Sequence, residues 1–408
     1  MKPLREAQGE VIAGINRMGT ERIGIEVALG RILAEPAVSS EPIPPFPNSA
    51  MDGFAVQASD VASTPVVLPI NEDVPAGTVP SMTVGSGTAT RIMTGAPMPA
   101  GADSVVPVED TESGTSDSVT IVTGVSRGTH VRPAGGDIAI GDVVVEAGIR
   151  LSARDLGSLA SIGVSPVVHL QPVVALMSTG DEVVEYTTGN LGPGTIRDTN
   201  RAVLRGALDD LRVPYVDLGI VSDNVDALRE AYLHAADVGD AIISTGGVSM
   251  GDFDFVKQIL RESGSVDFWK VAMQPGKPFA FGNVDGVPLF GLPGNPVSTY
   301  VSFEQFVRPA LLAMMGATKL FRPQVQGVMG EDVTTSDQKD VFVRVMLAPD
   351  TDGSFVAVKA GGQGSNVLSG LANADAFAVV PVGVGSLSAG DPVKLEMFTW
   401  NENRGLDE

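Results

Sequence analysis

Hydroxyl, glycine and carboxylate residues follow three short apolar runs in the middle of this chain. The polar turns are Ser178–Glu182, Ser244–Asp252 and Gly291–Pro296. Glycine lets a backbone approach a ligand closely, hydroxyl and backbone N–H groups bind phosphate-like anions, and carboxylates bind Mg²⁺. The residue types therefore indicate a site for a phosphorylated ligand, although glycine and proline also serve simply to punctuate connections between strands and helices.

The apolar runs themselves have the composition of buried strands. They cover 173–177, 241–243 and 287–290, and helical patterns such as 224–236 alternate with them. This alternation predicts a doubly wound, mostly parallel sheet. Because the carboxyl ends of parallel strands lie on one edge of a sheet, the three polar turns are expected to meet there.

The composition excludes several classes of function. The chain has no cysteine, which rules out disulfides, thiolate zinc sites, iron–sulfur clusters and a cysteine nucleophile. Its 27 basic and 49 acidic residues give a net charge of −22, which repels nucleic-acid phosphates. The sequence lacks an apolar run of about 20 residues and a signal-peptide pattern, so we expect no membrane partner and a cytoplasmic location.

At 408 residues the chain is too long for one core, and changes in its pattern predict four parts. These are an N-terminal helical and linking part (1–38 and 149–171), a β-rich insertion (39–148), an α/β domain (172–318) and a small C-terminal β-barrel (319–400). The first part is expected to hold helices near 4–15, 27–33 and, after the capping box Ser152–Asp155, 153–162. The predicted fold class is thus multidomain, with a central doubly wound α/β domain between β-rich domains.

Five motifs in one order carry a resemblance to a known family. They are Pro44–Ala55 (PPFPNSAMDGFA), Ser178–Glu182 (STGDE), Ser244–Asp252 (STGGVSMGD), Pro275–Pro278 (PGKP) and Leu292–Pro296 (LPGNP). Each motif alone is weak, but together, with β-rich flanks, they span nearly the whole chain. The chain resembles the molybdopterin molybdenumtransferases, the bacterial MoeA family that is also represented by the gephyrin E domain.

That resemblance implies an enzyme at the end of molybdenum cofactor assembly, with a molybdopterin-binding α/β domain. The substrate would be adenylylated molybdopterin, whose dithiolene accepts molybdenum from molybdate while AMP is released by hydrolysis. The absence of cysteine fits, because the sulfurs belong to the pterin. Mg²⁺ is the implied cation, and the implied assembly is a homodimer whose clefts combine both subunits. A molybdopterin adenylyltransferase and molybdoenzymes are possible protein partners.

The resemblance also implies roles for individual residues. The expected catalytic residues are Asp52, Glu182, Asp252 and Lys277, and the expected Mg²⁺ ligands are Glu182, Asp252 and Asp254. The expected contacts to the substrate or its phosphates are Thr94, Ser178, Thr179, Gly180, Thr245, Gly246, Gly247, Ser249, Lys270, Gly276, Pro293, Asn295, Arg344 and Ser365.

Local structure offers a second interpretation of several of these residues. Asp252 also suits a helix N-cap, and Asp52 an Asx turn. Asp181, next to Glu182, suits a turn cap. Arg344 is as suited to an ion pair with Asp340 as to molybdate or a phosphate. Lys277 is held in a proline-rich loop, which favours a phosphate contact over a solvated surface position.

Three positions depart from the family pattern. Pro47 stands where many relatives have an acid, Phe54 replaces a tyrosine, and Gln274 stands where some relatives have a second lysine. Gln274 removes one cation near the expected phosphate site, so oxyanion binding is either weaker or supplied by Lys270. The 3 histidines are scattered and have no metal-ligand spacing.

Two other functions stay open on the sequence alone. A molybdopterin adenylyltransferase shares the α/β module but needs neither residues 39–148 nor the terminal β domain. A non-catalytic carrier of the cofactor would keep the fold, but the presence of Asp52, Glu182, Asp252 and Lys277 disfavours it. The sequence does not distinguish molybdate from tungstate, since both are tetrahedral dianions of nearly equal size.

Overall fold

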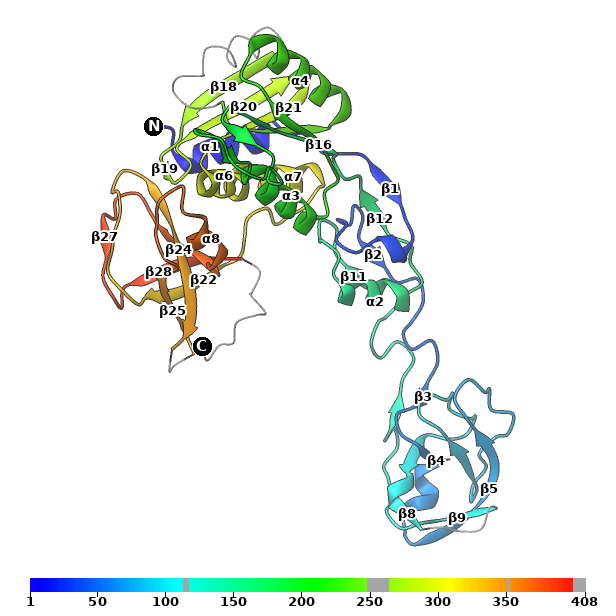
Figure 1. The fold of residues 1–408 in the computed structure, drawn as a ribbon. Helices are drawn as coiled ribbons and strands as arrows, with labels where there is room; N and C mark the ends of the chain where they lie inside the picture. Colours follow the sequence, from blue (N-terminus) through cyan, green and yellow to red (C-terminus); the bar gives the residue numbers. More distant parts are fainter. Residues whose placement is uncertain (113–116, 248–263, 351–352, 399–408) are drawn as a thin grey trace.

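The computed structural model describes residues 1–112, 117–247, 264–350 and 353–398. Figure 1 shows three masses: an α/β domain, a β-barrel beside it and a β-rich domain that lies apart, at the end of a narrow connection. The predicted multidomain α/β and β-rich fold class is confirmed.

A mixed six-stranded sheet forms the centre of the α/β domain. Its order is β16 (Tyr215–Val221), β13 (Val174–Thr179), β17 (Ala241–Thr245), β21 (Val287–Leu292), β20 (Pro278–Val284) and β18 (Gly264–Lys270). The first four strands are parallel, while β20 runs antiparallel to both of its neighbours. The three apolar runs therefore form neighbouring strands, in the order β13, β17, β21.

Helices cover both faces of this sheet, because successive strand side chains point to opposite faces. Val174 and Leu176 pack with α1 (Leu4–Ala13), α3 (Asn200–Leu211), α6 (Pro296–Ser302) and α7 (Arg308–Met314). Ala175 and Met177 pack on the other face with α4 (Val225–Val238). A π-helical turn, Phe303–Val307, joins α6 to α7.

The N-terminal part contains one of the two helices expected before Pro36. Helix α1 forms as predicted, but only a 3-10 turn, Ile25–Val27, stands near the second. Leu33 instead donates its N–H to the carbonyl of Ile149 (3.0 Å), and Ile32 bridges to Arg150. These hydrogen bonds between distant segments replace the local bonds of a helix, so the predicted helix is wrong.

The rest of this part is built from short pairs of strands and one helix. The pairs are β1 (Thr20–Arg22) with β12 (Val167–His169) and β2 (Ala37–Val38) with β11 (Val143–Val145). Helix α2 (Ala153–Ser161) begins with the predicted capping box between Ser152 and Asp155.

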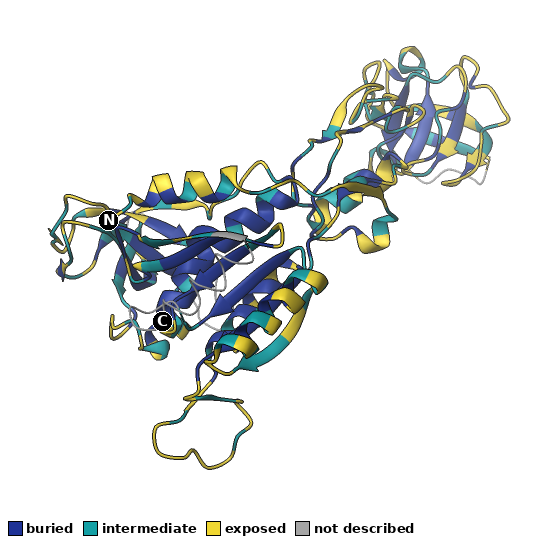
Figure 2. Ribbon diagram, turned by 90° about the horizontal axis from the view of Figure 1, so that it is seen from above, coloured by how far each residue is buried: buried dark blue, intermediate teal, exposed yellow. Residues whose placement is uncertain are grey.

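The separate β-rich domain contains a second six-stranded sheet. Its order is β7 (Ser104–Pro107), β4 (Gly53–Val56), β6 (Ala89–Ile92), β5 (Val66–Val74), β9 (Ser118–Ile121) and β8 (Thr111–Glu112), with 3-10 turns at Ala58–Val61 and Val108–Asp110. Two segments lead to it, and they pair through β3 (Asn48–Ser49) and β10 (Val131–Arg132). The views in Figures 1 and 2 both place this domain away from the α/β sheet.

The C-terminal domain is a closed barrel of five strands. The ring runs β24 (Asp340–Pro349), β25 (Phe355–Lys359), β22 (Gln324–Met329), β28 (Pro392–Met397), β26 (Ala376–Val380) and back to β24. Smaller elements are β23 (Val333–Thr334), β27 (Ser386–Leu387) and α8 (Leu368–Ala372). Strand β19 (Met273–Gln274) leaves the α/β domain to pair with β24, which ties the barrel to the sheet.

A buried ion pair also fixes the linker to the barrel. Arg322 donates from both Nε and Nη2 to the carboxylate of Glu304, at 2.9 Å each. Beside it, Gln305 donates to Glu396 of β28 at 2.7 Å. None of the helices in the part of the chain that the structure describes is long and apolar enough to cross a membrane.

Candidate functional site

The ends of β13, β17 and β21 touch one another, as the sequence predicts. Ser178 is in register with Thr245, and Thr245 with Leu292. Ser178 and Thr179 belong to strand β13 rather than to the turn after it. A Cβ at Gly246 would lie 2.3 Å from the carbonyl oxygen of Thr179, so glycine is required where these two chain segments meet.

Asn200, which sequence reasoning missed, ties the turns together. It is the first residue of α3 and is 9% exposed. Its Nδ2 donates to Thr245 Oγ1 and to the Gly294 carbonyl, at 2.8 Å each. Thr245 Oγ1 in turn donates to the carbonyl of Pro293 (3.2 Å). The Asn200 side chain joins Thr245 and Gly294, which are distant from it in sequence. No local sequence pattern predicts such a contact.

Buried polar atoms without a partner gather at this edge. Ser178 and Thr179 are 2% and 3% exposed, and their hydroxyls have no hydrogen-bond partner among the residues described. The same is true of Asn200 Oδ1. Because an unpaired buried polar group is costly, such groups are usually paired in the working state of a protein, with water or a ligand. These atoms can donate to and accept from a polar ligand.

Lysines complete the edge on the other side of β21. Since β18 and β20 are antiparallel, the end of β18 at Lys270 lies beside Pro278 at the start of β20. Lys277 precedes Pro278 and is exposed, and its carbonyl accepts from Val271 N (2.8 Å). Gly276 is buried with φ +101°, and a Cβ there would lie 2.9 Å from Ser302 Oγ.

Glu182 brings a carboxylate to the edge after β13. The side chain is exposed, and a Cβ at Gly180 would lie 2.8 Å from Glu182 Oε2, so the carboxylate folds back over that glycine. Asp181 has the alternative role expected for it, because its Oδ1 accepts from the N–H of Asp223 (3.1 Å) before α4.

Three of the predicted site residues lie in the part of the chain that the structure does not describe. Asp252, Asp254 and Ser249 lie outside the described residues, while Gly247 is the last described residue after β17, with φ +61°. Within the described ranges no three His, Cys, Asp or Glu side chains are grouped so that they could hold a metal ion.

The barrel contributes a glycine-rich loop, 361–366, next to the turn after β21. The carbonyl of Ser365 accepts from Val297 N (3.0 Å), at the start of α6, which brings the loop close to Asn295. Asn295 is exposed, and its carbonyl accepts from Thr299 Oγ1 at 3.0 Å. Ser365, Asn295 and Pro293 are therefore in one neighbourhood.

Arg344 supports this loop from β24, on the face of the strand opposite to Val343 and Val345, which form the barrel core. Its side chain is 0% exposed, and Nη2 donates to the carbonyls of Gly362 (2.7 Å) and Gly364 (3.2 Å). Burial lowers the pKa of the guanidinium. Nε and Nη1 have no partner among the described residues, and no ion pair with Asp340 forms there. The guanidinium shapes the loop, while its predicted contact to an anion stays a prediction.

Asp52 and Thr94 form a pair of their own in the separate β-rich domain. Thr94 donates its N–H (2.7 Å) and its hydroxyl (2.8 Å) to Asp52 Oδ1. Both hydrogen bonds lower the pKa of Asp52, and the bond from the Thr94 backbone N–H has the larger effect. Within one chain the domain that holds β4, which Asp52 precedes, lies away from the α/β sheet (Figures 1 and 2).

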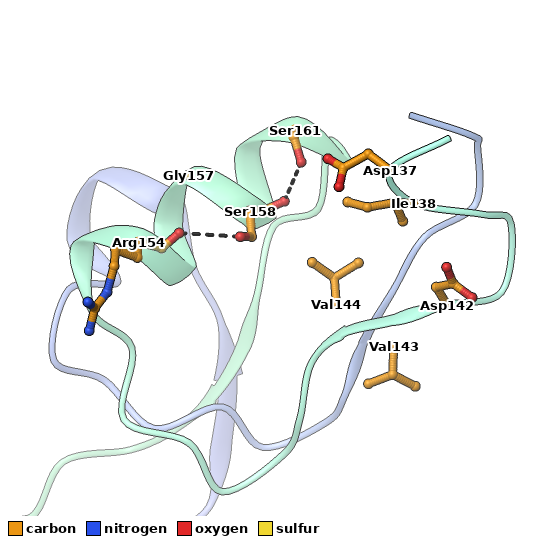
Figure 3. A pocket seen from close by; sticks show the side chains of 9 residues that line it. All are labelled: Asp137, Ile138, Asp142, Val143, Val144, Arg154, Gly157, Ser158 and Ser161. Atoms are coloured by element: carbon orange, nitrogen blue, oxygen red, sulfur yellow. Dashed lines mark hydrogen bonds between the residues drawn. The ribbon is translucent and has the colours of Figure 1, made fainter. Parts of the chain in front are cut away.

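A cavity of about 760 Å³ lies elsewhere, between α2 and β11. Figure 3 shows Asp137, Asp142, Arg154, Ser158 and Ser161 on its wall, with apolar residues between them. Ser158 and Ser161 donate to carbonyls of their own helix, at 3.4 and 2.8 Å. None of the predicted site residues lines this cavity.

The fold and the edge together define a class: a multidomain protein whose doubly wound α/β domain carries hydroxyl, lysine and glycine residues along the carboxyl edge of its sheet. Three family models match the chain, the MoeA N-terminal region (domain I and II) at residues 2–163, a probable molybdopterin binding domain at 175–313 and the MoeA C-terminal region (domain IV) at 326–398. The chain belongs to the MoeA family.

Relatives that align with this chain over nearly their whole length support this assignment. The molybdopterin molybdenumtransferase of Haemophilus influenzae is 35% identical, over 93% of this chain and 94% of its own length. Molybdopterin molybdenumtransferase 2 of Mycobacterium tuberculosis is 36% identical, over 97% and 99%. A crystal structure of a molybdopterin biosynthesis MoeA protein from Pyrococcus horikoshii is similar with a TM-score of 0.83 and 27% identity, covering 98% of this chain and 100% of that one.

Proposed function

We propose that this chain is a molybdopterin molybdenumtransferase, which inserts molybdenum from molybdate into molybdopterin. The observation that carries the proposal is the α/β sheet edge, where unpartnered buried hydroxyls, the glycine turn at Gly246 and exposed Lys277 lie together. The named activity of relatives that match more than nine-tenths of the chain supports it. The substrate in this proposal is the adenylylated pterin, and the second product is AMP.

The residues at the edge can divide the work. Ser178 and Thr179 are hydroxyl donors for the substrate, and Gly246 lets the turn after β17 pack against Thr179. Lys277 presents an ammonium group to the phosphates or to the incoming oxyanion. Ser365, on the barrel loop, faces the same neighbourhood across Val297. Together they hold the dithiolene end and the phosphate chain in fixed orientation, which lowers the entropic part of the barrier.

The described residues at this edge could supply only part of the coordination shell of Mg²⁺. Of the three expected ligands, the described residues provide one, the carboxylate of Glu182, rather than a cage of protein ligands. Mg²⁺ is commonly held by one or two carboxylates together with substrate phosphates. In the proposal Glu182, with Asp252 and Asp254, would hold it, and the ion would neutralise charge on the phosphoanhydride.

Two alternatives are less well supported. A molybdopterin adenylyltransferase needs only the α/β module, whereas MoeA-type regions match this chain on both sides of that module. A carrier needs no catalytic groups, yet Glu182 and Lys277 stand exposed at the edge. The chain is also proposed to be a cytoplasmic homodimer, with adenylyltransferase and molybdoenzymes as partners.

One assay tests the proposal. Purified protein receives adenylylated molybdopterin, Mg²⁺ and molybdate, and AMP and active cofactor are measured. We expect AMP release that depends on molybdate and that falls in Glu182→Ala and Lys277→Ala but not in Glu230→Ala, an exposed acid on α4. Consumption of ATP with adenylylation of the pterin would favour the molybdopterin adenylyltransferase. Tight binding without turnover would favour the carrier.

A further inference from the structure

A lysine from the barrel lies against the lysine loop of the α/β domain. Lys339 Nζ is 3.5 Å from Gln274 Oε1, a long hydrogen bond. Gln274 is the last residue of β19 and is three residues before Lys277, which lies between β19 and β20. The loop that carries the exposed cation of the site therefore has a second ammonium group beside it, from another domain.

The backbone holds Lys339 in this place. The next residue, Asp340, is in parallel register with Met273, and its N–H donates to the Ala272 carbonyl at 2.9 Å. The backbone at position 339 is thus held by the pairing of β19 with β24. The contact between Lys339 and Gln274 therefore depends on this pairing as well as on the conformation of the long lysine side chain. A lysine on a free loop would also lose backbone conformational entropy on binding.

The charges at this corner are not balanced. None of the ion pairs that the described residues form with one another uses Lys270, Lys277 or Lys339. Nearby Lys2 provides the contrast, since it pairs with Glu10 and lies 3.8 Å from the centroid of the Trp269 ring. In a chain with a net charge of −22, a group of ammonium ions without carboxylate partners is suited to attract an anion.

We propose that Lys339 binds the tetrahedral oxyanion together with Lys277, so that the barrel supplies the second cation of the site. This rests on the proposed function and adds a residue to it. Gln274 then carries no charge because the ammonium beside it comes from Lys339. The barrel acts as part of the binding site, and its pairing through β19 and β24 sets the distance between the two cations.

The test measures molybdate binding directly, by equilibrium dialysis of the full-length protein at low ionic strength. Lys339→Ala is expected to raise the dissociation constant for molybdate about tenfold, and Lys339→Arg to raise it less. Adding Gln274→Lys to Lys339→Ala should restore most of the affinity, because it returns an ammonium group to the same place. Lys394→Ala, an exposed barrel lysine on β28, is the matched control and should leave binding unchanged.

Three results would overturn the inference. They are unchanged affinity in Lys339→Ala, an equal loss in Lys394→Ala, and no molybdate binding by the unmodified protein. Should the alanine variant not fold, as judged by its melting temperature, Lys339→Gln is measured instead. AMP release is assayed in parallel, so that molybdate binding through Lys339 without molybdate-dependent AMP release would contradict the proposed function and leave this inference standing.

Discussion

Asp52 shows how one neighbour favours the ionised form of a carboxylate that is predicted to belong to the site. Thr94 donates twice to the same oxygen, and hydrogen bonds to a carboxylate favour its ionised form. Thr94→Val removes the hydroxyl and keeps the N–H, so the pKa of Asp52 should rise partway towards its ordinary value of 3.8. Carbon-detected NMR titration of the Asp52 carboxyl measures this. An unchanged pKa would mean that the hydroxyl does not act on this carboxylate.

Asn200 is expected to matter for stability as well as for binding. Asn200→Ala leaves Thr245 and the Gly294 carbonyl without a buried donor, which costs about 1–3 kcal/mol of unfolding free energy. Urea denaturation gives the value. Asn190→Ala, at an exposed position on the loop before β15 (Ile196–Arg197), is the matched control. Equal stability of the two variants would show that Asn200 does not hold the turns together.

The site residues differ in how far the sequence could foresee them. Thr245, Gly246 and Lys277 stand in motifs with a glycine or proline beside them, and the topology brings their elements to one edge. Asn200 carries no such mark, since its role arises only once α3 packs against the end of β17. Arg344 is predicted as an anion contact, and its burial depends on the loop that folds over it at Gly362 and Gly364, which no local pattern specifies.

At the scale of elements, the start of α2 offers a clean measurement. Asp155 accepts from Ser152 Oγ and Ser152 N, at 2.7 Å each, and the hydroxyl bond is the main cause of its lowered pKa. Asp155→Ala should lower the unfolding free energy by about 1 kcal/mol at pH 7. Because the pKa of Asp155 is lowered in the folded state, its contribution to the unfolding free energy is fully present above about pH 4. The contribution is lost as the pH falls through the pKa of the folded state.

The pH series is therefore the informative part of that experiment. The difference between the wild-type protein and Asp155→Ala should shrink as the pH falls below about 4, because the wild-type carboxyl becomes protonated. Ser158→Ala, on the same helix, is the control for a general effect of alanine. A difference that stays constant through the titration would contradict the capping role.

Elements with local signals were predicted well. Helix α2 has its capping box, and α4 begins after Asn224, whose side chain accepts from Ala227 N (2.8 Å). The expected helix near 27–33 failed because its apolar spacing is equally compatible with an extended segment, and Leu33 finds its partner at Ile149. Pairing between distant segments decided the structure there, and hydrophobic periodicity does not report it.

At the scale of the whole molecule, the separation of Asp52 from the sheet edge offers a test of the proposed homodimer. If the homodimer is formed as proposed, Asp52→Ala and Lys277→Ala damage different halves of one composite site. Mixed dimers of the two inactive variants then contain one intact site, and part of the AMP-forming activity should return on mixing. Mixing under conditions that exchange subunits, followed by the AMP assay, measures this.

The controls for that experiment are direct. Each variant alone should stay inactive at the same total concentration, and light scattering should give the mass of a dimer. Glu182→Ala mixed with Lys277→Ala should show no recovery, because both residues lie on the α/β edge of the same chain. Recovery in that second mixture, or none in the first, would mean that Asp52 does not act across subunits.

The central claim is that the carboxyl edge of the α/β sheet, between Thr245 and Lys277, holds the reacting oxyanion. Anomalous diffraction at the molybdenum absorption edge, from crystals soaked in molybdate, locates the metal without assumptions about the protein. We expect the peak at this edge, in contact with Lys277 and next to the barrel loop at Ser365. A peak only in the cavity between Asp137 and Ser158, or none at the sheet edge, would contradict the claim.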